Sequence, residues 1–311
     1  MNWVALATYR QGSVLKPALV FNKIMYDLGS IKAAGVAGIK AEWLEGGVLS
    51  MLQTWPETEA WLKEAAPAAE KLIASGDLQA VASGAGVAAP YLAQRIFCAA
   101  SNYAKHANEM GTVLAAKAQS KPYMFLKLSN TVVGDGDIIQ MPPETHMLDW
   151  EVELAAVIGK RCRRISVEDA LDAVACYTVI NDISARDLNV RSDYPFKHDW
   201  FQGKCHDTFA PIGPWLVPSW QIPDPQAVNL RLDVNGVPMQ EDSTGAMIWS
   251  VREQIAYLST IVTLEPGDII ATGTPTGVGM ARGVYLKHGD KIVASVEGIG
   301  TLTNEVRAEA V

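Results

Sequence analysis

The chain lacks the features that mark membrane proteins and nucleic-acid-binding proteins. No run of 18 or more apolar residues occurs, because two glycines and a proline interrupt the longest uncharged stretch, residues 78–94, so we expect no transmembrane helix. The apolar stretch in residues 1–10 is too short for a signal peptide and is more typical of a first strand. The net charge is −8 with no basic cluster, which argues against binding to nucleic acid or to an anionic membrane.

Cysteine is scarce, and its spacing does not fit a structural metal site. The four cysteines are Cys98, Cys162, Cys176 and Cys205, and no two of them form a Cys-x-x-Cys pair. A zinc site built from them is therefore not expected. Free thiols in a reducing cytoplasm are the simplest interpretation, which predicts a cytoplasmic protein.

The composition is that of a globular protein large enough for more than one domain. The 311 residues are 49% hydrophobic and 19% charged, which is ordinary for a folded chain. Residues 1–90 contain short strand-like pieces and a pattern typical of a helix over residues 57–74, and the Gly/Ala-rich segment 83–90 resembles a linker. We therefore predict a small N-terminal α/β domain over residues 1–90 and a second domain over residues 91–311.

The second region is mostly strands and turns, which predicts a mixed but mainly β fold. A helix is expected from Ser166 to Val174 because Asp169 follows Ser166 at capping-box spacing, and the Asn235-Gly236 pair predicts a hairpin. Helical spacing of apolar residues predicts a second helix over residues 250–263. The expected strands are residues 96–100, 123–128, 175–180 and 269–272.

Two glutamates lie inside a run, residues 148–159, that otherwise has the pattern of one buried strand. Because side chains alternate faces along a strand, Glu151 and Glu153 point to the same side, about 7 Å apart. Like charges among apolar neighbours repel each other and lose hydration. A cation between them would explain the pair. The alternative is that both glutamates line the solvated face of a half-exposed strand.

A third carboxylate, Asp182, follows the strand expected over residues 175–180. Together with Glu151 and Glu153 it would supply three hard oxygen ligands, which suit Mg²⁺, Mn²⁺ or Ca²⁺ rather than zinc. Mg²⁺ takes six ligands, so three positions would remain for water or substrate. The alternative is that Asn181-Asp182 is ordinary turn chemistry.

The segment around His106 holds a candidate base. His106 and Glu109 are three residues apart and meet on one face if they belong to a helical turn. A carboxylate beside an imidazole orients it and raises its basicity, as a general base for water requires. A surface contact on a helix is the alternative.

Three further features could bind or stabilise negative charge. Lys204, among aromatic residues and glycine, could stabilise an oxyanion or enolate. Arg186 could hold a carboxylate, and the 273–277 segment offers backbone N–H groups and a threonine hydroxyl to an anion. The alternatives are a surface lysine and an arginine paired with Asp187 or another acid.

In this order, these sets resemble the fumarylacetoacetate hydrolase superfamily, in particular bacterial members of the acylpyruvase or 2,4-dioxo acid hydrolase type. The resemblance covers roughly residues 91–307. The motifs that carry it are Asn102-Tyr103-x-x-His106-x-x-Glu109, Phe125-Leu126-Lys127, Asp149-Trp150-Glu151-x-Glu153-Leu154, Asn181-Asp182-x-Ser184-Ala185-Arg186-Asp187, Gly203-Lys204 and Thr272-Gly273-Thr274-Pro275-x-Gly277-Val278-Gly279.

The resemblance implies an α+β, mostly β catalytic domain, a mixed β-roll with layered sheets, usually in a homodimer. It implies that Glu151, Glu153 and Asp182 bind Mg²⁺ or Mn²⁺, with Ca²⁺ as a further option. It also implies that His106 and Glu109 form a water-activating dyad, carried on a lid that closes over substrate.

The resemblance implies further contacts to the substrate. Lys204 matches a lysine that polarises the substrate oxygen, Thr274 a substrate-contacting threonine and Arg186 a substrate-orienting arginine. Tyr103 and Asn189 are the other expected substrate-binding residues, although Asn189 stands where several hydrolases carry glutamine. Trp150 stands where many members have tyrosine, and the segment between Asp182 and Lys204 looks slightly longer than in short members.

We therefore expect a metal-dependent hydrolase that cleaves a carbon–carbon bond in a 2,4-dioxo acid and releases pyruvate or a similar 2-oxo acid. Its partner would be a small dioxo or oxo acid. A decarboxylase of a 2-oxo diacid, or an isomerase of an unsaturated hydroxy-diacid, would use the same metal and enolate chemistry without an attacking water. A non-catalytic binding protein on this fold would show a lost ligand or a lost dyad, and the sequence retains both.

Overall fold

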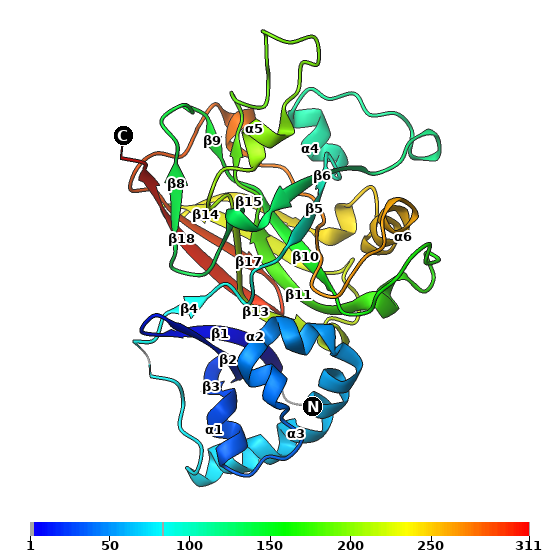
Figure 1. Cartoon of the computed structure of the whole chain (residues 1–311). Helices are drawn as coiled ribbons and strands as arrows, with labels where there is room; N and C mark the ends of the chain where they lie inside the picture. Colours follow the sequence, from blue (N-terminus) through cyan, green and yellow to red (C-terminus); the bar gives the residue numbers. More distant parts are fainter. Residues whose placement is uncertain (1–2, 83, 311) are drawn as a thin grey trace.

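Two β-sheets form the frame of the molecule and carry the candidate site (Figure 1). The computed structural model describes residues 3–82 and 84–310. The parts of the expected first strand and linker that fall on Met1, Asn2 and Ser83 therefore lie outside the described residues. The mixed, mostly β architecture predicted from the sequence is confirmed.

The larger sheet has eleven strands, which come from the N-terminal part of the chain and from its middle up to β16. Its strand order is β3-β2-β1-β13-β11-β10-β16-β5-β6, while β4 pairs with β1 and β7 with β13. The bounds are β1 Val4–Gln11, β2 Val14–Phe21, β3 Ile24–Asp27, β4 Val87–Ala88, β5 Arg95–Ala100, β6 Tyr123–Leu128, β7 Val132–Val133, β10 Val152–Ile158, β11 Val174–Asn181, β13 Ala210–Pro218 and β16 Ile269–Ala271.

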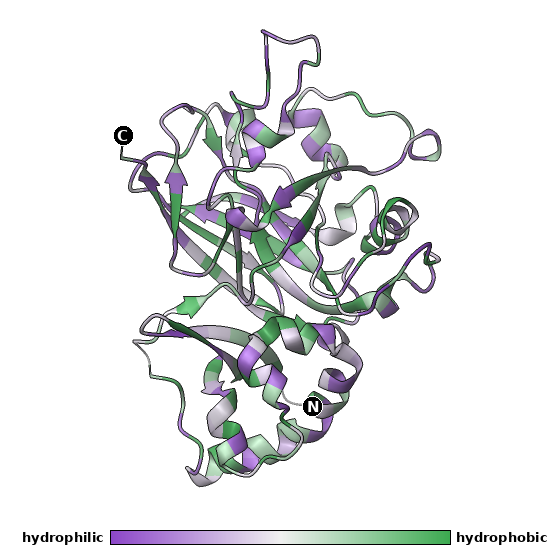
Figure 2. Cartoon of the chain, viewed as in Figure 1, coloured by the Kyte–Doolittle hydropathy of each residue, from purple (hydrophilic) through white to green (hydrophobic). Residues whose placement is uncertain are grey.

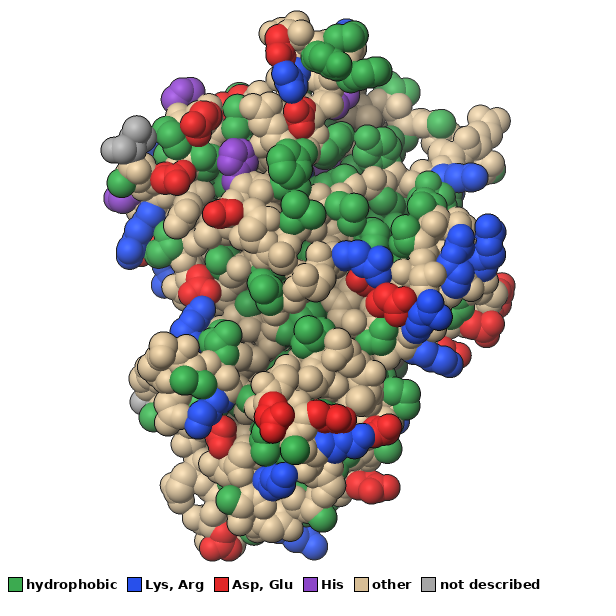
Figure 3. Space-filling view, viewed as in Figure 1, with side chains coloured by type: hydrophobic (Ala, Val, Ile, Leu, Met, Phe, Trp, Pro, Cys, Tyr) green, Lys and Arg blue, Asp and Glu red, His purple; other side chains and the backbone are tan. Residues whose placement is uncertain are grey.

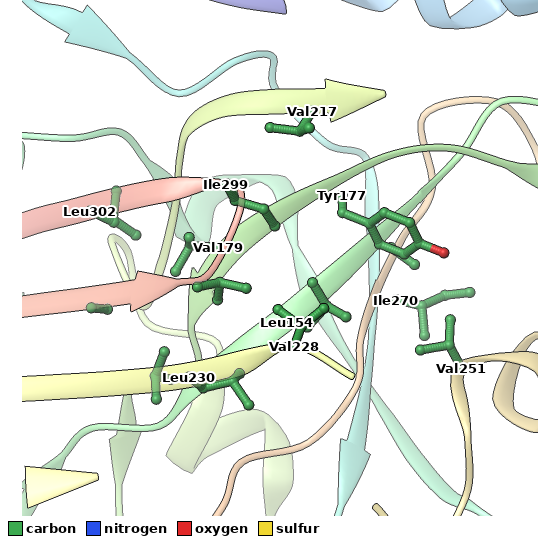
Figure 4. Close-up of a cluster of buried hydrophobic side chains, with 14 of the residues drawn as sticks. Leu154, Tyr177, Val179, Val217, Val228, Leu230, Val251, Ile270, Ile299 and Leu302 are labelled. Carbon is green, nitrogen blue, oxygen red and sulfur yellow. The ribbon is translucent and has the colours of Figure 1, made fainter. Parts of the chain in front are cut away.

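A second, five-stranded sheet packs over the middle of the first. Its order is β15-β14-β17-β18-β8, with bounds β8 Ile138–Met141, β14 Asn229–Val234, β15 Val237–Ser243, β17 Lys291–Val296 and β18 Gly300–Ala308. Figure 4 shows Leu154 and Val179 of the larger sheet facing Leu230 and Leu302 of the smaller one. Burying each such side chain contributes roughly 1.5–3 kcal/mol, so the two sheets hold β10 and β11 in a fixed frame.

Three helices cover the N-terminal part of the larger sheet, at the blue end of Figure 1. They are α1 Leu28–Ala33, α2 Ala41–Gln53 and α3 Trp55–Ser75. The helix expected over residues 57–74 is therefore present as α3. The sequence did not reveal α2, because Gly46 and Gly47 interrupt its pattern and Gly47 has non-helical backbone angles (φ 64°).

The predicted division at residue 90 lies where the larger sheet is continuous. The strand β4 falls inside the expected linker and pairs with β1, with Thr8 opposite Ala88. The strand β1 also pairs with β13, with Leu6 opposite Leu216. The two-domain division stays a prediction, and in this structure both parts share one sheet.

The run 148–159 is two strands instead of the one expected. The strand β9, Leu148–Asp149, pairs with β12, Ser184–Ala185, and β10 starts only at Val152. Strand pairing is interrupted at Trp150 and Glu151 because the Glu151 N–H donates to the side-chain oxygen of Asn181 (2.9 Å) and not to the backbone of a neighbouring strand. The pairing of β9 with β12 brings the residues after Asp182 beside those before Glu151.

The prediction of a helix from Ser166 to Val174 is wrong. Ser166 does accept a hydrogen bond from the Asp169 N–H (3.1 Å), but only a short 3₁₀ turn follows, η3 Ala170–Ala173, because the chain enters β11 at Val174. A capping signal fixes one turn and not the length of a helix. The expected hairpin is present, with positive φ at Asn235 and Gly236.

The remaining helices are short apart from α6, which begins with the capping box of Ser250 and Glu253. Their bounds are α4 Ala104–Glu109, α5 Trp200–Lys204, α6 Val251–Ile261, α7 Gly279–Arg282, η1 Lys117–Gln119, η2 Ser129–Thr131, η4 Ser219–Gln221 and η5 Thr244–Ala246.

Within the described residues, no helix is both long and apolar enough to cross a bilayer. All four cysteines are buried free thiols. Figure 2 shows that hydrophobic residues recur along the strands and along the sheet-covering faces of the helices.

Replacing Ser250 with alanine should destabilise the fold without touching the carboxylates. The change removes the side-chain acceptor for the Glu253 N–H and should lower the free energy of unfolding by about 1 kcal/mol. Calorimetric melting measures the loss. Thr260→Ala, at an exposed position of the same helix, is the control and should change stability by less than about 0.5 kcal/mol. Equal losses in both variants would contradict the capping role.

Candidate functional site

Three buried carboxylates meet where β10 begins and β11 ends. Glu151, Glu153 and Asp182 each offer an oxygen atom, and these atoms all lie within 4.8 Å of one another. The Asp182 N–H donates to the Glu151 carbonyl oxygen (2.8 Å), which ties the two segments together. All three side chains are at least 95% buried, so the solvated-face alternative for the glutamate pair is excluded.

Lys204 bridges two of these carboxylates. Its ammonium group lies 2.8 Å from Glu151 and 2.7 Å from Asp182. Burial would lower the pKa of Lys204, but the two carboxylates outweigh it and hold this pKa above its ordinary value. The lysine is therefore charged at neutral pH and also lines the cavity above the carboxylates.

Lys127 fixes the other side of Asp182. It is fully buried on β6, and its ammonium lies 2.6 Å from Asp182 Oδ1. It also donates to the carbonyl oxygens of Ile183 and Phe209. Lys127 belongs to the Phe125-Leu126-Lys127 motif, but its role was not predicted from the sequence. The signal that could have indicated a role is the position of a charged residue on the buried face of a predicted strand.

Arg186 is held by a buried carboxylate that the sequence analysis also left without a role. Its guanidinium donates to Asp149 (2.8 Å) and to Glu151. Asp149 is fully buried and accepts further hydrogen bonds from the N–H groups of Gly279 (2.6 Å) and Met280 (3.0 Å). Asp149 thus joins the arginine to the start of α7.

The two glutamates have opposite electrostatic environments. Burial would raise the pKa of Glu151, but Arg186 and Lys204 outweigh burial and hold this pKa below its ordinary value. Burial, followed by the charges of Asp182 and Glu151, raises the pKa of Glu153 well above its ordinary value. Glu153 accepts the Gly273 N–H (2.7 Å), and no cation lies within 4.0 Å of it among the described residues.

A divalent cation fits this set of donors. Four buried carboxylates, the three of the cluster and Asp149, face three buried cations, Lys127, Arg186 and Lys204, so when all four carboxylates are ionised, 4 − 3 leaves one negative charge uncompensated. That deficit falls at Glu153, beside oxygen atoms spaced for a shared ligand. Carboxylate oxygens are the donors that Mg²⁺, Mn²⁺ and Ca²⁺ prefer.

His106 and Glu109 form a directed pair on α4. His106 Nδ1 lies 2.8 Å from Glu109 Oε1. Because a carboxylate only accepts hydrogen bonds, Nδ1 is the donor in this pair, and Nε2 is the nitrogen that carries the lone pair of a neutral imidazole. His106 is buried and lines the same cavity as Glu151 and Lys204.

The glycine segment after β16 orients this pair. The Gly277 N–H donates to both carboxylate oxygens of Glu109 (3.1 and 3.0 Å), and the Gly277 carbonyl accepts the Trp150 indole N–H (3.1 Å). Gly277 has φ 103°, and a Cβ there would lie 2.0 Å from the Met239 carbonyl oxygen. A glycine is therefore required at this point.

The remaining expected substrate residues occupy different environments. Thr274 lines the cavity, but its hydroxyl donates to the Val152 carbonyl oxygen (2.9 Å), so its proton is used within the protein. Asn189 lines the cavity, and its side-chain oxygen is buried without a described partner. Tyr103 is only 1% exposed and is not among the cavity-lining residues.

The cavity above the carboxylates measures about 820 Å³. Its lining includes the polar groups His106, Glu151, Arg186, Lys204 and Thr274, and many of its other lining residues are apolar. Figure 3 shows hydrophobic side chains gathered over this upper part of the molecule. A larger cavity of about 1010 Å³ lies beside β14 and β17 and contains none of the three carboxylates.

Comparisons with known proteins show which family the chain resembles. Residues 95–307 match the family described as Fumarylacetoacetate (FAA) hydrolase C-terminal. A mitochondrial oxaloacetate tautomerase of Rattus norvegicus is 41% identical over 214 residues, which is 68% of this chain and 66% of that protein.

Solved structures also resemble the chain. A putative HpcE protein from Mycobacterium smegmatis is 30% identical, with a TM-score of 0.79 and full coverage of both chains. The fumarylpyruvate hydrolase of Pseudomonas aeruginosa, solved with Mn²⁺ and pyruvate, is 33% identical, with a TM-score of 0.63 over 73% of this chain and 93% of that one. Because the family match spans more than half of the chain, the chain belongs to the fumarylacetoacetate hydrolase family.

Proposed function

We propose that the protein is a metal-dependent hydrolase that cleaves the carbon–carbon bond of a 2,4-dioxo acid. The observation that carries the proposal is His106, which lines one cavity with Glu151 of the carboxylate cluster and pairs with Glu109, a carboxylate held by Gly277. A base with its free nitrogen beside a cation site is suited to activating water. The Mn²⁺ and pyruvate complex of the related fumarylpyruvate hydrolase supports the same substrate class.

Glu151, Glu153 and Asp182 would hold Mg²⁺ or Mn²⁺, with Ca²⁺ as a further option. When bound, the ion would polarise the oxo group of the substrate and lower the energy of the developing negative charge. One uncompensated negative charge in the site plus a divalent cation gives a net charge of +1. That balance suits a substrate with one carboxylate at this end.

The residues of the chain would divide the work between binding and proton transfer. Arg186 and Lys204 present positive charge to the carboxylate and oxo group of the substrate. His106 Nε2 takes a proton from water, and the oxygen of that water attacks the 4-oxo carbon. The bond between carbons 3 and 4 then breaks, its electron pair stays on the pyruvate fragment as an enolate, and protonation of carbon 3 gives pyruvate and a carboxylic acid.

A second candidate is an enolisation without attack by water, such as tautomerisation or decarboxylation of a 2-oxo diacid. The relation to an oxaloacetate tautomerase at 41% identity favours it. The same cations would stabilise the same kind of enolate, so the fold and the metal site do not separate the two candidates. The contribution of His106 does separate them.

Replacing His106 with alanine should abolish most acylpyruvate cleavage. Loss of a general base should lower kcat by roughly 10²–10⁴-fold, and pyruvate release from a panel of 2,4-dioxo acids with Mg²⁺ would measure it. His288→Ala, at an exposed histidine outside the site, is the control and should retain wild-type rates. Retained hydrolysis in His106→Ala would refute the mechanism.

Oxaloacetate is the discriminating second substrate in that experiment. If the enzyme decarboxylates or tautomerises oxaloacetate and His106→Ala keeps this activity, the two chemistries are separable in one site. If wild-type enzyme turns over oxaloacetate but no 2,4-dioxo acid of the panel, the second candidate replaces the first.

Mn²⁺ should raise the melting temperature more at pH 7.5 than at pH 5. Because the pKa of Glu153 is raised in the folded protein, the metal-free fold gains stability from this proton at low pH and loses it as pH rises through the raised pKa. Bound metal displaces the proton, so its stabilising effect grows over the same pH range. Thermal shift with and without Mn²⁺ measures the difference.

Glu153→Gln should weaken Mn²⁺ binding and flatten this pH dependence. Asp135→Asn is the matched control, because burial also raises the pKa of Asp135, which accepts the Thr303 N–H away from the cluster. The control should bind Mn²⁺ like the wild type. Equal Mn²⁺ affinity in wild type and Glu153→Gln would exclude Glu153 as a ligand.

A further inference from the structure

One buried amide connects the smaller sheet to the carboxylate cluster. Gln240 lies on β15, opposite Leu232 of β14, and is only 1% exposed. Its side chain reaches β10, where Oε1 accepts the Val152 N–H (3.0 Å). The same amide donates through Nε2 to the Thr274 hydroxyl (2.8 Å) and to the Pro275 carbonyl oxygen (2.9 Å).

These partners fix the orientation of the amide. The Val152 N–H can only donate and the Pro275 carbonyl can only accept, so exchanging Oε1 and Nε2 of Gln240 would break both bonds. Both hydrogen atoms of Nε2 are used. The amide therefore has one arrangement in the fold.

Val152 occupies the position between the two glutamates of the cluster. Gln240 holds its N–H, and the Thr274 hydroxyl holds its carbonyl oxygen (2.9 Å). Because Gln240 also bonds Thr274, the three residues form a closed ring of hydrogen bonds. The ring determines how the backbone turns as it passes from Glu151 into β10 and then to Glu153.

We propose that Gln240 is a positioning residue that sets the spacing of Glu151 and Glu153 for a bound divalent cation. The proposal rests on the metal-binding function proposed above. Among the described residues, the Gln240 amide hydrogen-bonds to neither glutamate side chain and acts through the Val152 peptide and Thr274. Removing the amide would leave the Val152 N–H and the Pro275 carbonyl buried without partners, and the backbone would shift to recover them.

The test is the affinity of the purified protein for Mn²⁺, measured by calorimetric titration of the metal alone. Gln240→Met keeps the length and the apolar stem of the side chain and removes all three hydrogen bonds. We expect the Kd for Mn²⁺ to rise about 10–100-fold, as is usual when a residue that supports a ligand is lost. Asn304→Leu is the matched control.

Asn304 is a comparable buried amide in the same smaller sheet. It is 3% exposed on β18, and its Nδ2 donates to the carbonyl oxygens of Gly134 (2.8 Å) and Asp137 (2.9 Å), away from the cluster. Asn304→Leu should lower the melting temperature as Gln240→Met does and leave the Kd for Mn²⁺ unchanged. A weaker Kd in both variants would show a general loss of structure and overturn the proposal.

Gln240→Asn keeps the proposal falsifiable if Gln240→Met does not fold. It retains the amide but shortens it by one methylene, so the group no longer reaches Val152 and Thr274 together. We expect a weaker Kd for Mn²⁺ in this variant as well. A wild-type Kd in either folded Gln240 variant overturns the positioning role alone, whereas a wild-type protein that binds no Mn²⁺ overturns the metal-binding function itself.

Discussion

The concentration of buried carboxylates at the junction of β9, β10 and β11 is the constraint on which the rest of the site depends. Charges removed from water are tolerated only when opposite charges or hydrogen-bond donors surround them. Lys127, Lys204 and Arg186 supply most of that compensation, each on a different element. The cluster therefore requires β6, α5 and the segment directly after β12 to be in place. The electrostatic stability of the site thus depends on the packing of the sheets.

The segment from Gly273 to Met280 stabilises the carboxylates further through its backbone, in addition to the three cationic side chains. Its backbone N–H groups donate to Glu153, Glu109 and Asp149 in turn. Backbone donors carry no formal charge and cost no side-chain entropy, so they hold anions without neutralising them. A single stretch of chain therefore orients Glu109 beside His106, Asp149 beside Arg186, and the proposed metal ligand Glu153.

Much of this site could be predicted from the sequence because its motifs are local. Short spacing in the sequence predicts Glu151 near Glu153 and His106 near Glu109, and both pairs are close in the structure, although β10 begins only at Val152. Lys127, Asp149 and Gln240 could not be assigned in that way, since each acts on a partner from a distant segment.

The same distinction between local and distant interactions explains the errors in the predicted elements. Ser166 does accept the Asp169 N–H, but the helix is limited to one turn because the chain pairs into β11 from Val174. The break at Trp150 and Glu151 follows from the Asn181 side chain, which lies 30 residues further along the chain. Local patterns predict how a segment starts, and contacts with distant segments determine how far it continues.

The pairing of β1 with β13 has a consequence for how such a protein can be shortened. A chain reduced to residues 95–307, the part shared with the family, would leave one side of β13 without its neighbour. An uncovered strand with apolar residues such as Leu216 offers its backbone to any other extended chain. By pairing with β13, the N-terminal strand β1 covers that edge and should prevent self-association along it.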